Sequence, residues 1–408
     1  MRLPYDVNRI IEVLEQAGYE AYSVGGCVRD SLLGEEPKDY DITTSASPSQ
    51  VKALFKKTID TGIEHGTVTV RMNGESYEVT TYRIDGEYED FRHPKEVKFT
   101  GNLEEDLMRR DFTINAMAYN EKSGLVDLYG GEEDLKNHII RCVGDPVKRF
   151  TEDALRMLRA VRFAAKLSFT IEDSTFDAMK LLHENLAHVS AERIYVELSK
   201  TLLSDNPEMI YAAYKAGLTG IFMPELDAFF EREDAKKLLL GLKNAEPNLQ
   251  VRLALLLENV TAESDEEAGQ VAYHILKRLK TDKYTFETVR KLVSLRTYRL
   301  KNDRYEVRKF LALCGREIAE YYLACLKVKG DSEKILADEL TSTVNSIYDA
   351  NECVKVVDMA LSGSDLIEMG FEKGTTIGKV LDKLFSEVLK DPSLNNRDDL
   401  IGIAKEIR

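Results

Sequence analysis

The sequence lacks the features that mark secreted and membrane proteins. Only five cysteines occur in 408 residues, odd in number and without paired spacing, so neither a disulfide framework nor a zinc site is indicated. No apolar run approaches the roughly 18–20 residues that span a bilayer, and the N-terminal MRLPYDVNRIIEVL follows the pattern of an amphipathic helix instead of a signal peptide. We therefore expect a cytoplasmic protein with no membrane contact and no disulfide-linked partner.

The chain also has fewer basic residues than acidic residues. The chain has 56 Lys and Arg against 71 Asp and Glu, a net charge of −15. Because Lys and Arg supply most non-specific affinity for nucleic acids by neutralising phosphates, this balance excludes indiscriminate nucleic-acid binding. Basic residues do cluster within 109–110, 156–162 and 296–308, so any RNA contact should be confined to such stripes.

The length predicts several packed domains in an α+β chain. Up to about residue 140, β-branched runs at 65–72 and 77–84 alternate with glycine-containing turns, which predicts a mixed-sheet head. Beyond residue 146, Leu, Ala, Lys and Glu recur at helical spacing, with breaks before Pro207, Pro224, Pro247 and Pro392. We therefore expect a head and then an elongated all-α stack, divided into the head 1–145, a neck 146–205, a body 206–310 and a tail 311–408.

A glycine pair follows a short apolar run in YSVGGCVRDSLLG (22–34). Two glycines permit close backbone approach, a helix beginning there would add partial positive charge, and Arg29 can offer a fork of donors to phosphate oxygens. The segment therefore predicts a phosphate cradle. A purely structural strand-turn-helix accounts for the pair equally well.

Two aspartates come next, in KDYDITT (38–44). Residues two apart in a strand share a face, so we expect Asp39 and Asp41 to lie side by side. Their repulsion is costly unless a cation lies between them, and oxygen-only ligands suit Mg²⁺, which also takes water and substrate phosphate. A D-x-D alone is more often a solvated strand end, but the glycine turn just upstream favours a metal site.

These two segments resemble the signature of the nucleotidyltransferase superfamily that includes DNA polymerase beta, which implies a polymerase-beta-like head. Later segments are similar to the class II tRNA nucleotidyltransferases and the bacterial poly(A) polymerases, and the resemblance covers most of the chain. The motifs that carry it most clearly are RRDFTINAMAYN (109–120), DLYGGEEDL (127–135), DPVKRFTEDALRMLRAVRFAAKL (145–167), AERIYVELSKTLLS (191–204) and AGLTGIFMPEL (216–226).

The resemblance implies template-independent addition of CCA to the 3′ end of tRNA from CTP and ATP. It implies that Asp39 and Asp41 hold Mg²⁺, that Gly26 and Arg29 touch the nucleotide, and that Arg110 contributes to catalysis and nucleotide binding. Phosphoryl transfer needs in-line positioning of the RNA 3′-hydroxyl and neutralisation of developing charge, which metals and an arginine can supply. The alternative for Arg110 and its neighbours is a surface salt-bridge cluster.

The segment EDALRMLRAVR (152–162) predicts one helix whose i+3 steps give it a polar and cationic edge. That edge consists of Asp153, Arg156, Arg159 and Arg162. In the family this segment acts as an amino-acid template for CTP and ATP, a role carried here onto Asp153 as acceptor and Arg156 as donor, while the later arginines meet the triphosphate. The alternative is a surface ion pair on a neck helix.

A charged segment broken by Gly and Pro, YRIDGEYEDFRHPKEVKF (82–99), predicts a mobile loop. Similar segments in CCA-adding enzymes are associated with the switch from C to A addition, which favours A-adding capacity and assigns that role to Asp85, Asp90 and Arg92. The alternative is a connection with no mechanistic role.

Two further segments bear on whether the chain has a metal-dependent hydrolytic site or is a poly(A) polymerase. In VRLALLLENVTA (251–262), Glu258 and Asn259 occupy the positions of a His-Asp metal pair in many relatives, so we expect a scaffold remnant and no hydrolytic site. Poly(A) polymerases carry an arginine-rich G-R-R-F-R segment where this chain has DTGIEHGTVTV (60–70), which favours the tRNA enzyme. An enzyme adding only the final A, and a catalytically silent RNA-binding protein, stay open as alternatives.

Overall fold

The computed structural model describes residues 1–85 and 97–407, which fall into two compact units. Unit 1 comprises Met1–Lys236 with Arg278–Lys280, and unit 2 comprises Lys237–Lys277 with Thr281–Arg408. Among the described residues, every helix is too short or too polar to cross a lipid bilayer.

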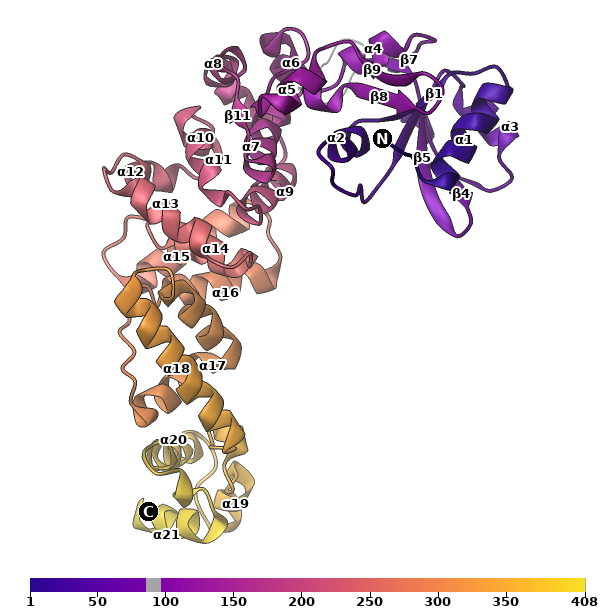
Figure 1. Ribbon diagram of the computed structural model, residues 1–408. Coiled ribbons are helices and arrows are strands. Elements are labelled where there is room, and N and C mark those ends of the chain that lie inside the picture. Colours follow the sequence, from indigo (N-terminus) through magenta and orange to yellow (C-terminus); the bar gives the residue numbers. More distant parts are fainter. Residues whose placement is uncertain (86–96, 408) are drawn as a thin grey trace. The chain divides into compact units, whose positions relative to one another are not determined.

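Unit 1 opens with a seven-stranded mixed sheet in the order β3-β4-β5-β2-β1-β8-β9. Its neighbours pair antiparallel except β2 and β5, which are parallel. The strands are β1 (Ala21–Val24), β2 (Asp41–Thr44), β3 (Thr58–Gly62), β4 (Thr67–Met72), β5 (Glu75–Thr81), β8 (Met117–Asn120) and β9 (Gly124–Asp127). The accompanying helices are α1 (Tyr5–Gln16), α2 (Gly26–Leu32), α3 (Pro48–Leu54), α4 (Leu103–Met108) and α5 (Gly131–Lys136) (Figure 1). The predicted mixed-sheet head is confirmed.

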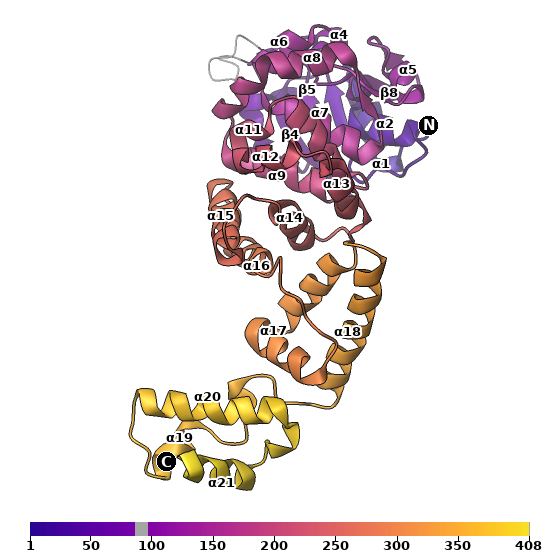
Figure 2. The same ribbon diagram turned by 90° about the vertical axis from the view of Figure 1, so that its left-hand side faces the viewer.

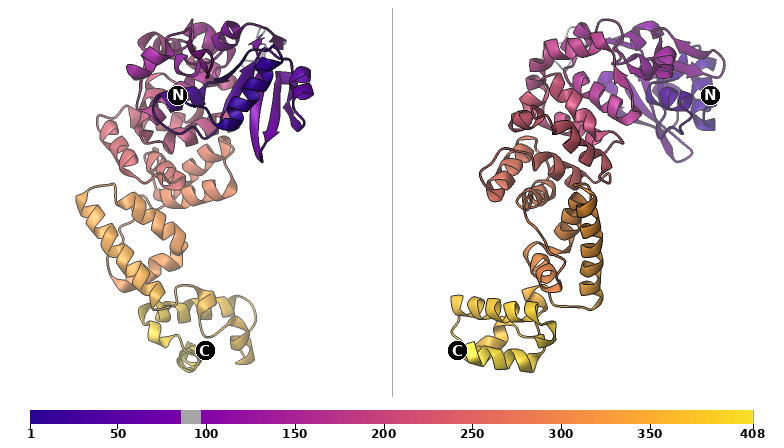
Figure 3. Two further views of the ribbon diagram at one scale, coloured as in Figure 1. Left: turned by 45° about the vertical axis from the view of Figure 1, so that its right-hand side comes forward. Right: turned by 60° about the vertical axis from the view of Figure 1, so that its left-hand side comes forward.

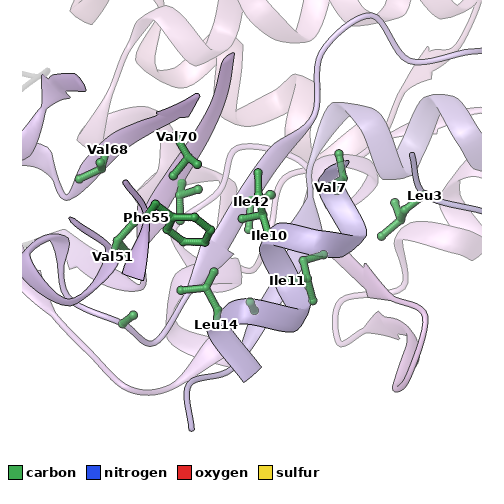
Figure 4. Packing of buried hydrophobic residues seen from close by; sticks show 13 residues of the cluster. Leu3, Val7, Ile10, Ile11, Leu14, Ile42, Val51, Phe55, Val68 and Val70 are labelled. Atoms are coloured by element: carbon green, nitrogen blue, oxygen red, sulfur yellow. The ribbon is translucent and has the colours of Figure 1, made fainter. Parts of the chain in front are cut away.

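Helix α1 supplies one side of the head's hydrophobic core. Its buried residues Val7, Ile10, Ile11 and Leu14 follow the i, i+3, i+4, i+7 spacing of one helical face. That face packs against the sheet, where Ile42 is fully buried (Figures 3 and 4). The core therefore fixes strand β2, and with it the residues that precede it.

Leu14→Ala is expected to destabilise unit 1 by about 3 kcal/mol, because a fully buried leucine leaves a cavity in this core. Leu181→Ala makes the same change on a side chain that is 68% exposed, and should cost less than about 0.5 kcal/mol. Urea denaturation of both variants measures the difference, and equal losses would contradict this account of the core.

Helices follow the sheet in unit 1. They are α6 (Pro146–Glu152), α7 (Leu155–Leu167), α8 (Asp173–Leu182), α9 (Ala191–Leu202), α10 (Ile210–Lys215), α11 (Thr219–Phe222) and α12 (Asp227–Phe230). Strand β11 (Thr170–Ile171) is a short departure from the all-helical prediction beyond residue 146. It pairs in parallel with β10 (Ile139–Ile140) of the predicted head.

The predicted single helix over 152–162 is wrong at its start. Helix α6 ends at Glu152, and Asp153 has extended dihedrals of φ −142° and ψ 102° before α7 begins at Leu155. The cause is local: the Asp153 carboxylate accepts a hydrogen bond from the Leu155 N–H at 3.1 Å, a side-chain to backbone bond that competes with a continuous helix.

The segment predicted as a loop over 82–99 begins and ends in strands. Strand β6 (Arg83–Asp85) pairs antiparallel with β7 (Val97–Phe99), with Asp85 opposite Val97. Asp90 and Arg92 lie outside the described residues, so their role stays a prediction of the sequence.

Unit 2 is helical throughout its described length (Figure 2). Its helices are α13 (Ala235–Asn244), which spans the sequence boundary between the units, α14 (Leu249–Leu257), α15 (Asp265–Arg278), α16 (Lys283–Val293), α17 (Arg304–Leu326), α18 (Asp331–Asp349), α19 (Gly363–Glu368), α20 (Thr375–Lys390) and α21 (Arg397–Ile407). The four predicted proline breaks are confirmed across the two units: Pro207, Pro224 and Pro392 open short 3₁₀ turns, and Pro247 lies between α13 and α14.

Candidate nucleotidyl-transfer site

Strand pairing brings the glycine turn and the aspartates together at one end of the interior strands β1 and β2. Strands β1 and β2 are antiparallel, with Val24 at the end of β1 opposite Asp41 at the start of β2. The turn at Gly25 and Gly26 therefore begins beside Asp41. Asp39 lies before the strand begins, so the predicted placement of both aspartates on one strand face is corrected: only Asp41 is in the strand.

The two aspartates affect each other electrostatically. Asp39 and Asp41 are both exposed, yet protein around the Asp41 carboxyl removes enough water to raise its pKa. Arg110 opposes that rise, and the negative charge of Asp39 adds to it. The site thus holds two carboxylates close enough to repel and one guanidinium that offsets the repulsion.

Gly25 is the residue that lets Arg110 approach. It has φ +81°, and a Cβ added there would lie 3.1 Å from Nη1 of Arg110, so a side chain would be strained and would meet the guanidinium. Arg110 is held by a buried carboxylate, with Nη2 3.3 Å from Oδ2 of Asp106. Burial alone would raise the pKa of Asp106, but Arg109 and Arg110 outweigh it and lower the pKa.

Arg29 is buried next to the same turn. Its Nη1 donates to Oδ1 of Asn115 at 2.6 Å, and its Nη2 lies 2.6 Å from the Asp30 carboxylate. A Cβ added at Gly26 would lie 3.5 Å from Nη2 of Arg29. The predicted pair Gly26 and Arg29 is therefore brought together.

The predicted template residues already have protein partners. Oδ2 of Asp153 accepts from Nη2 of Arg193 at 2.9 Å. Arg156 is buried, and its guanidinium donates to Glu152 at 2.8 Å and to the Arg109 carbonyl at 2.9 Å. Both side chains are thus held in fixed orientations.

The two later arginines of α7 each meet a buried carboxylate. Arg159 makes a two-pronged contact with Oδ2 of Asp111, at 2.8 Å from Nε and 2.6 Å from Nη2. Nε of Arg162 lies 2.5 Å from the Glu197 carboxylate. With Arg29 and its partner Asp30, these contacts place three guanidiniums, each beside a carboxylate, around α2 and α7.

Sequence reasoning missed the partners supplied by α9. Arg193 and Glu197 are one turn apart on that helix, and they pair with Asp153 and Arg162. Two opposite charges at i and i+4 within the motif AERIYVELSK were the available signal, but such pairs more often stabilise an exposed helix by themselves.

Comparison with known proteins shows which family the chain belongs to. Three family models match: the poly(A) polymerase head domain over residues 21–141, the probable RNA and SrmB binding site of polymerase A over 168–230, and tRNA nucleotidyltransferase domain 2 over 262–404. The chain is 37% identical to the CCA-adding enzyme of Ligilactobacillus salivarius, covering 98% of this chain and 95% of that protein. The chain belongs to the CCA-adding enzyme family.

Two further comparisons agree with membership of this family. The CCA-adding enzyme of Leuconostoc mesenteroides is 38% identical over 98% of this chain and 96% of that protein. A crystal structure of the Bacillus stearothermophilus CCA-adding enzyme in complex with CTP superposes with a TM-score of 0.82 at 31% identity, covering 100% of this chain and 98% of that one. The predicted family and fold class are confirmed, and the chain is a nucleotidyltransferase.

Membership of a nucleotidyltransferase family implies use of a divalent metal ion, and the residues at this end of β1 and β2 fit one. Within the described residues no cluster of three or more His, Cys, Asp or Glu side chains is placed to hold a metal, so Asp39 and Asp41 would need water and substrate phosphate as further ligands. Two exposed, mutually repelling carboxylates match that requirement, because a hard cation with few protein ligands relieves their repulsion.

Glu258 and Asn259, predicted to be the remnant of a His-Asp metal pair, make structural contacts in unit 2. Burial raises the pKa of Glu258, although Lys329, whose Nζ is 2.7 Å from its carboxylate, opposes the rise. The Asn259 amide donates to the Leu255 carbonyl at 2.9 Å. Both side chains therefore make polar contacts with other residues of unit 2.

Asp111 offers a pH-dependent test of the arginine contacts. Burial would raise the pKa of Asp111, but Arg159 and the Asn115 amide outweigh it and lower the pKa to about 2. A carboxyl whose pKa is depressed on folding stabilises the fold above its unfolded pKa of about 3.9, and this stabilisation is lost as the pH falls toward 2. The destabilisation caused by Asp111→Asn should therefore be about 1 kcal/mol smaller at pH 3 than at pH 7.

Urea denaturation at the two pH values measures this difference. Asp177→Asn, at a side chain that is 72% exposed, is the matched control and should give the same small change at both. A destabilisation by Asp111→Asn that does not vary with pH would contradict the assignment of charge-dependent stability to this contact.

Proposed function

We propose that this chain adds the 3′-terminal CCA of tRNA from CTP and ATP without a nucleic-acid template. The observation that carries the proposal is the meeting of Asp39, Asp41 and Arg110 beside the glycine turn, in a chain that matches CCA-adding enzymes over nearly its whole length. Mg²⁺ is the proposed ion, because it prefers carboxylate, water and phosphate oxygens.

In the proposed reaction, Asp39 and Asp41 hold the metal, which when bound neutralises phosphate charge and activates the RNA 3′-hydroxyl. Arg110, fixed by Asp106, stabilises the charge that develops on the transferred phosphoryl group. Arg29 and the backbone at Gly26 bind the nucleotide's phosphates. Attack by the 3′-hydroxyl oxygen on the α-phosphorus of the nucleotide forms the new phosphodiester bond as the bond from that phosphorus to the bridging oxygen breaks. Pyrophosphate leaves with that oxygen, and the hydroxyl proton passes to solvent water.

The choice of nucleotide is proposed to rest on Asp153, which lies between α6 and α7, and on the arginines of α7. Asp153 would accept and Arg156 would donate hydrogen bonds to the base edge, while Arg159 and Arg162 meet the triphosphate. Both base-reading groups have protein partners in this structure, so a bound base would share or replace those partners.

The remaining assignments follow the same proposal. We assign residues 146–205 to the neck, 206–310 to the body and 311–408 to a tRNA-binding tail, and we propose that Asp85, Asp90 and Arg92 act in the switch to A addition. All five cysteines are free thiols, which suits the reducing cytoplasm that we propose as the compartment.

The proposal is tested with tRNA ending at the discriminator base, supplied with CTP, ATP and Mg²⁺ and read on a sequencing gel. The wild-type chain should add three nucleotides, and Asp41→Asn should lower the rates of C and A addition together by at least about 10³-fold. Asp60→Asn is the control, because Asp60 is an exposed head residue paired with Lys52.

The other functions give different products on that gel. An enzyme adding only A would extend tRNA ending in CC and leave the shorter substrate unchanged. A poly(A) polymerase would add a run of A, and a silent RNA-binding protein would add nothing. Near wild-type addition of C by Asp41→Asn would show that this carboxylate does not hold the metal.

Asp153→Ala is expected to relax selection of CTP and ATP over UTP and GTP, because base-edge hydrogen bonds contribute about 1–3 kcal/mol of discrimination, roughly 5- to 150-fold. Competition assays with all four nucleotides measure the ratio. Asp177→Ala makes the same change at an exposed site on α8 and should leave selection intact. Equal slowing of all four nucleotides by Asp153→Ala would rule out the templating role.

A further inference from the structure

An aromatic ring lies among the arginines proposed to meet the triphosphate. Phe163, on α7, is 5% exposed. Its ring centroid is 5.1 Å from the guanidinium carbon of Arg29, 5.5 Å from that of Arg159 and 4.0 Å from that of Arg162. All three distances are within the roughly 6 Å over which the ring quadrupole attracts a cation.

These guanidiniums repel one another, so their closeness needs compensation. Each has one carboxylate of its own: Asp30 for Arg29, Asp111 for Arg159 and Glu197 for Arg162. Those carboxylates lie on different elements and bind one arginine each. Phe163 is the one described aromatic residue that contacts all three cations.

The ring is itself held in place. Phe112 and Phe163 form a T-shaped pair, with centroids 5.7 Å apart and planes at 79°, a favourable geometry for aromatic rings. Phe112 is fully buried, so this contact anchors the Phe163 ring to the core of unit 1.

We propose that Phe163 is a positioning residue for the nucleotide's phosphates. It acts by keeping Arg29, Arg159 and Arg162 gathered at the site, and makes no contact with the base. The inference rests on the proposed function. It predicts that weakening the ring's attraction lowers affinity for the triphosphate equally for CTP and ATP and leaves base selection unchanged.

The test replaces Phe163 with phenylalanines carrying one, three or five ring fluorines, which weaken cation–π attraction in steps while nearly keeping the shape. Calorimetric titration of the full chain with CTP, ATP and inorganic tripolyphosphate, in the presence of Mg²⁺, should show the dissociation constants rising stepwise to roughly tenfold, alike for all three probes. KM should rise in parallel, with kcat changing less. Phe163→Leu, which removes the ring, should match the most fluorinated protein.

Phe176 is the matched control position. Its ring has Lys180 at 4.8 Å but contacts none of the three arginines among the described residues, so the same fluorination there should leave every affinity unchanged. Melting temperature is recorded throughout. A flat affinity across the Phe163 series, or a loss confined to one nucleotide, overturns the inference whatever the stability of Phe163→Leu.

If the proposed function is wrong, the experiments give a different result. In that case the unmodified chain itself would not extend tRNA with C and A. If it does extend tRNA and the fluorinated series shows no trend, Phe163 is a core residue alone.

Discussion

Repulsion between like charges is the constraint on which this site depends. At the start of β2, burial raises the pKa of Asp41, Arg110 opposes that rise, and the charge of Asp39 adds to it. Between α2 and α7 three guanidiniums surround Phe163, each with its own carboxylate. Because these contacts already order the charged side chains, a phosphate bound there under the proposed function would require little rearrangement of charge, which is the condition for strong electrostatic stabilisation of a transition state.

Short-range features of the fold could be predicted from the sequence. The strand-turn-helix at 21–32 follows from an apolar run, two glycines and a helix-forming segment, and the proline breaks follow from the missing N–H of proline. The start of β2 could not be predicted in the same way. It is set by the partners of Asp41, which are Val24 on β1 and Glu78 on β5, and only the folded sheet brings these together.

In the candidate site, likewise, the functional residues could be predicted from the sequence, but the side chains that contact them could not. Motifs named Arg29, Arg159 and Asp153, but their partners lie 86, 48 and 40 positions away, at Asn115, Asp111 and Arg193. With charged residues making up 31% of the chain, spacing alone cannot choose among so many possible pairs. The break before α7 has the same origin, since Asp153 caps Leu155 with one oxygen and meets Arg193 with the other.

This arrangement bears on how side chains could select a base under the proposed function. In this structure Asp153 accepts from Arg193, and Arg156 donates to Glu152 and to backbone carbonyls. A base that draws these groups away must replace what it displaces, since a buried donor or acceptor left unpaired costs about 1–3 kcal/mol. A base with the wrong edge would incur that cost without the compensating bonds. Discrimination would then arise because the correct base replaces the hydrogen bonds that it displaces, whereas a wrong base does not. Helix α9 supplies Arg193, so it would set the strength of the contact that the base must replace.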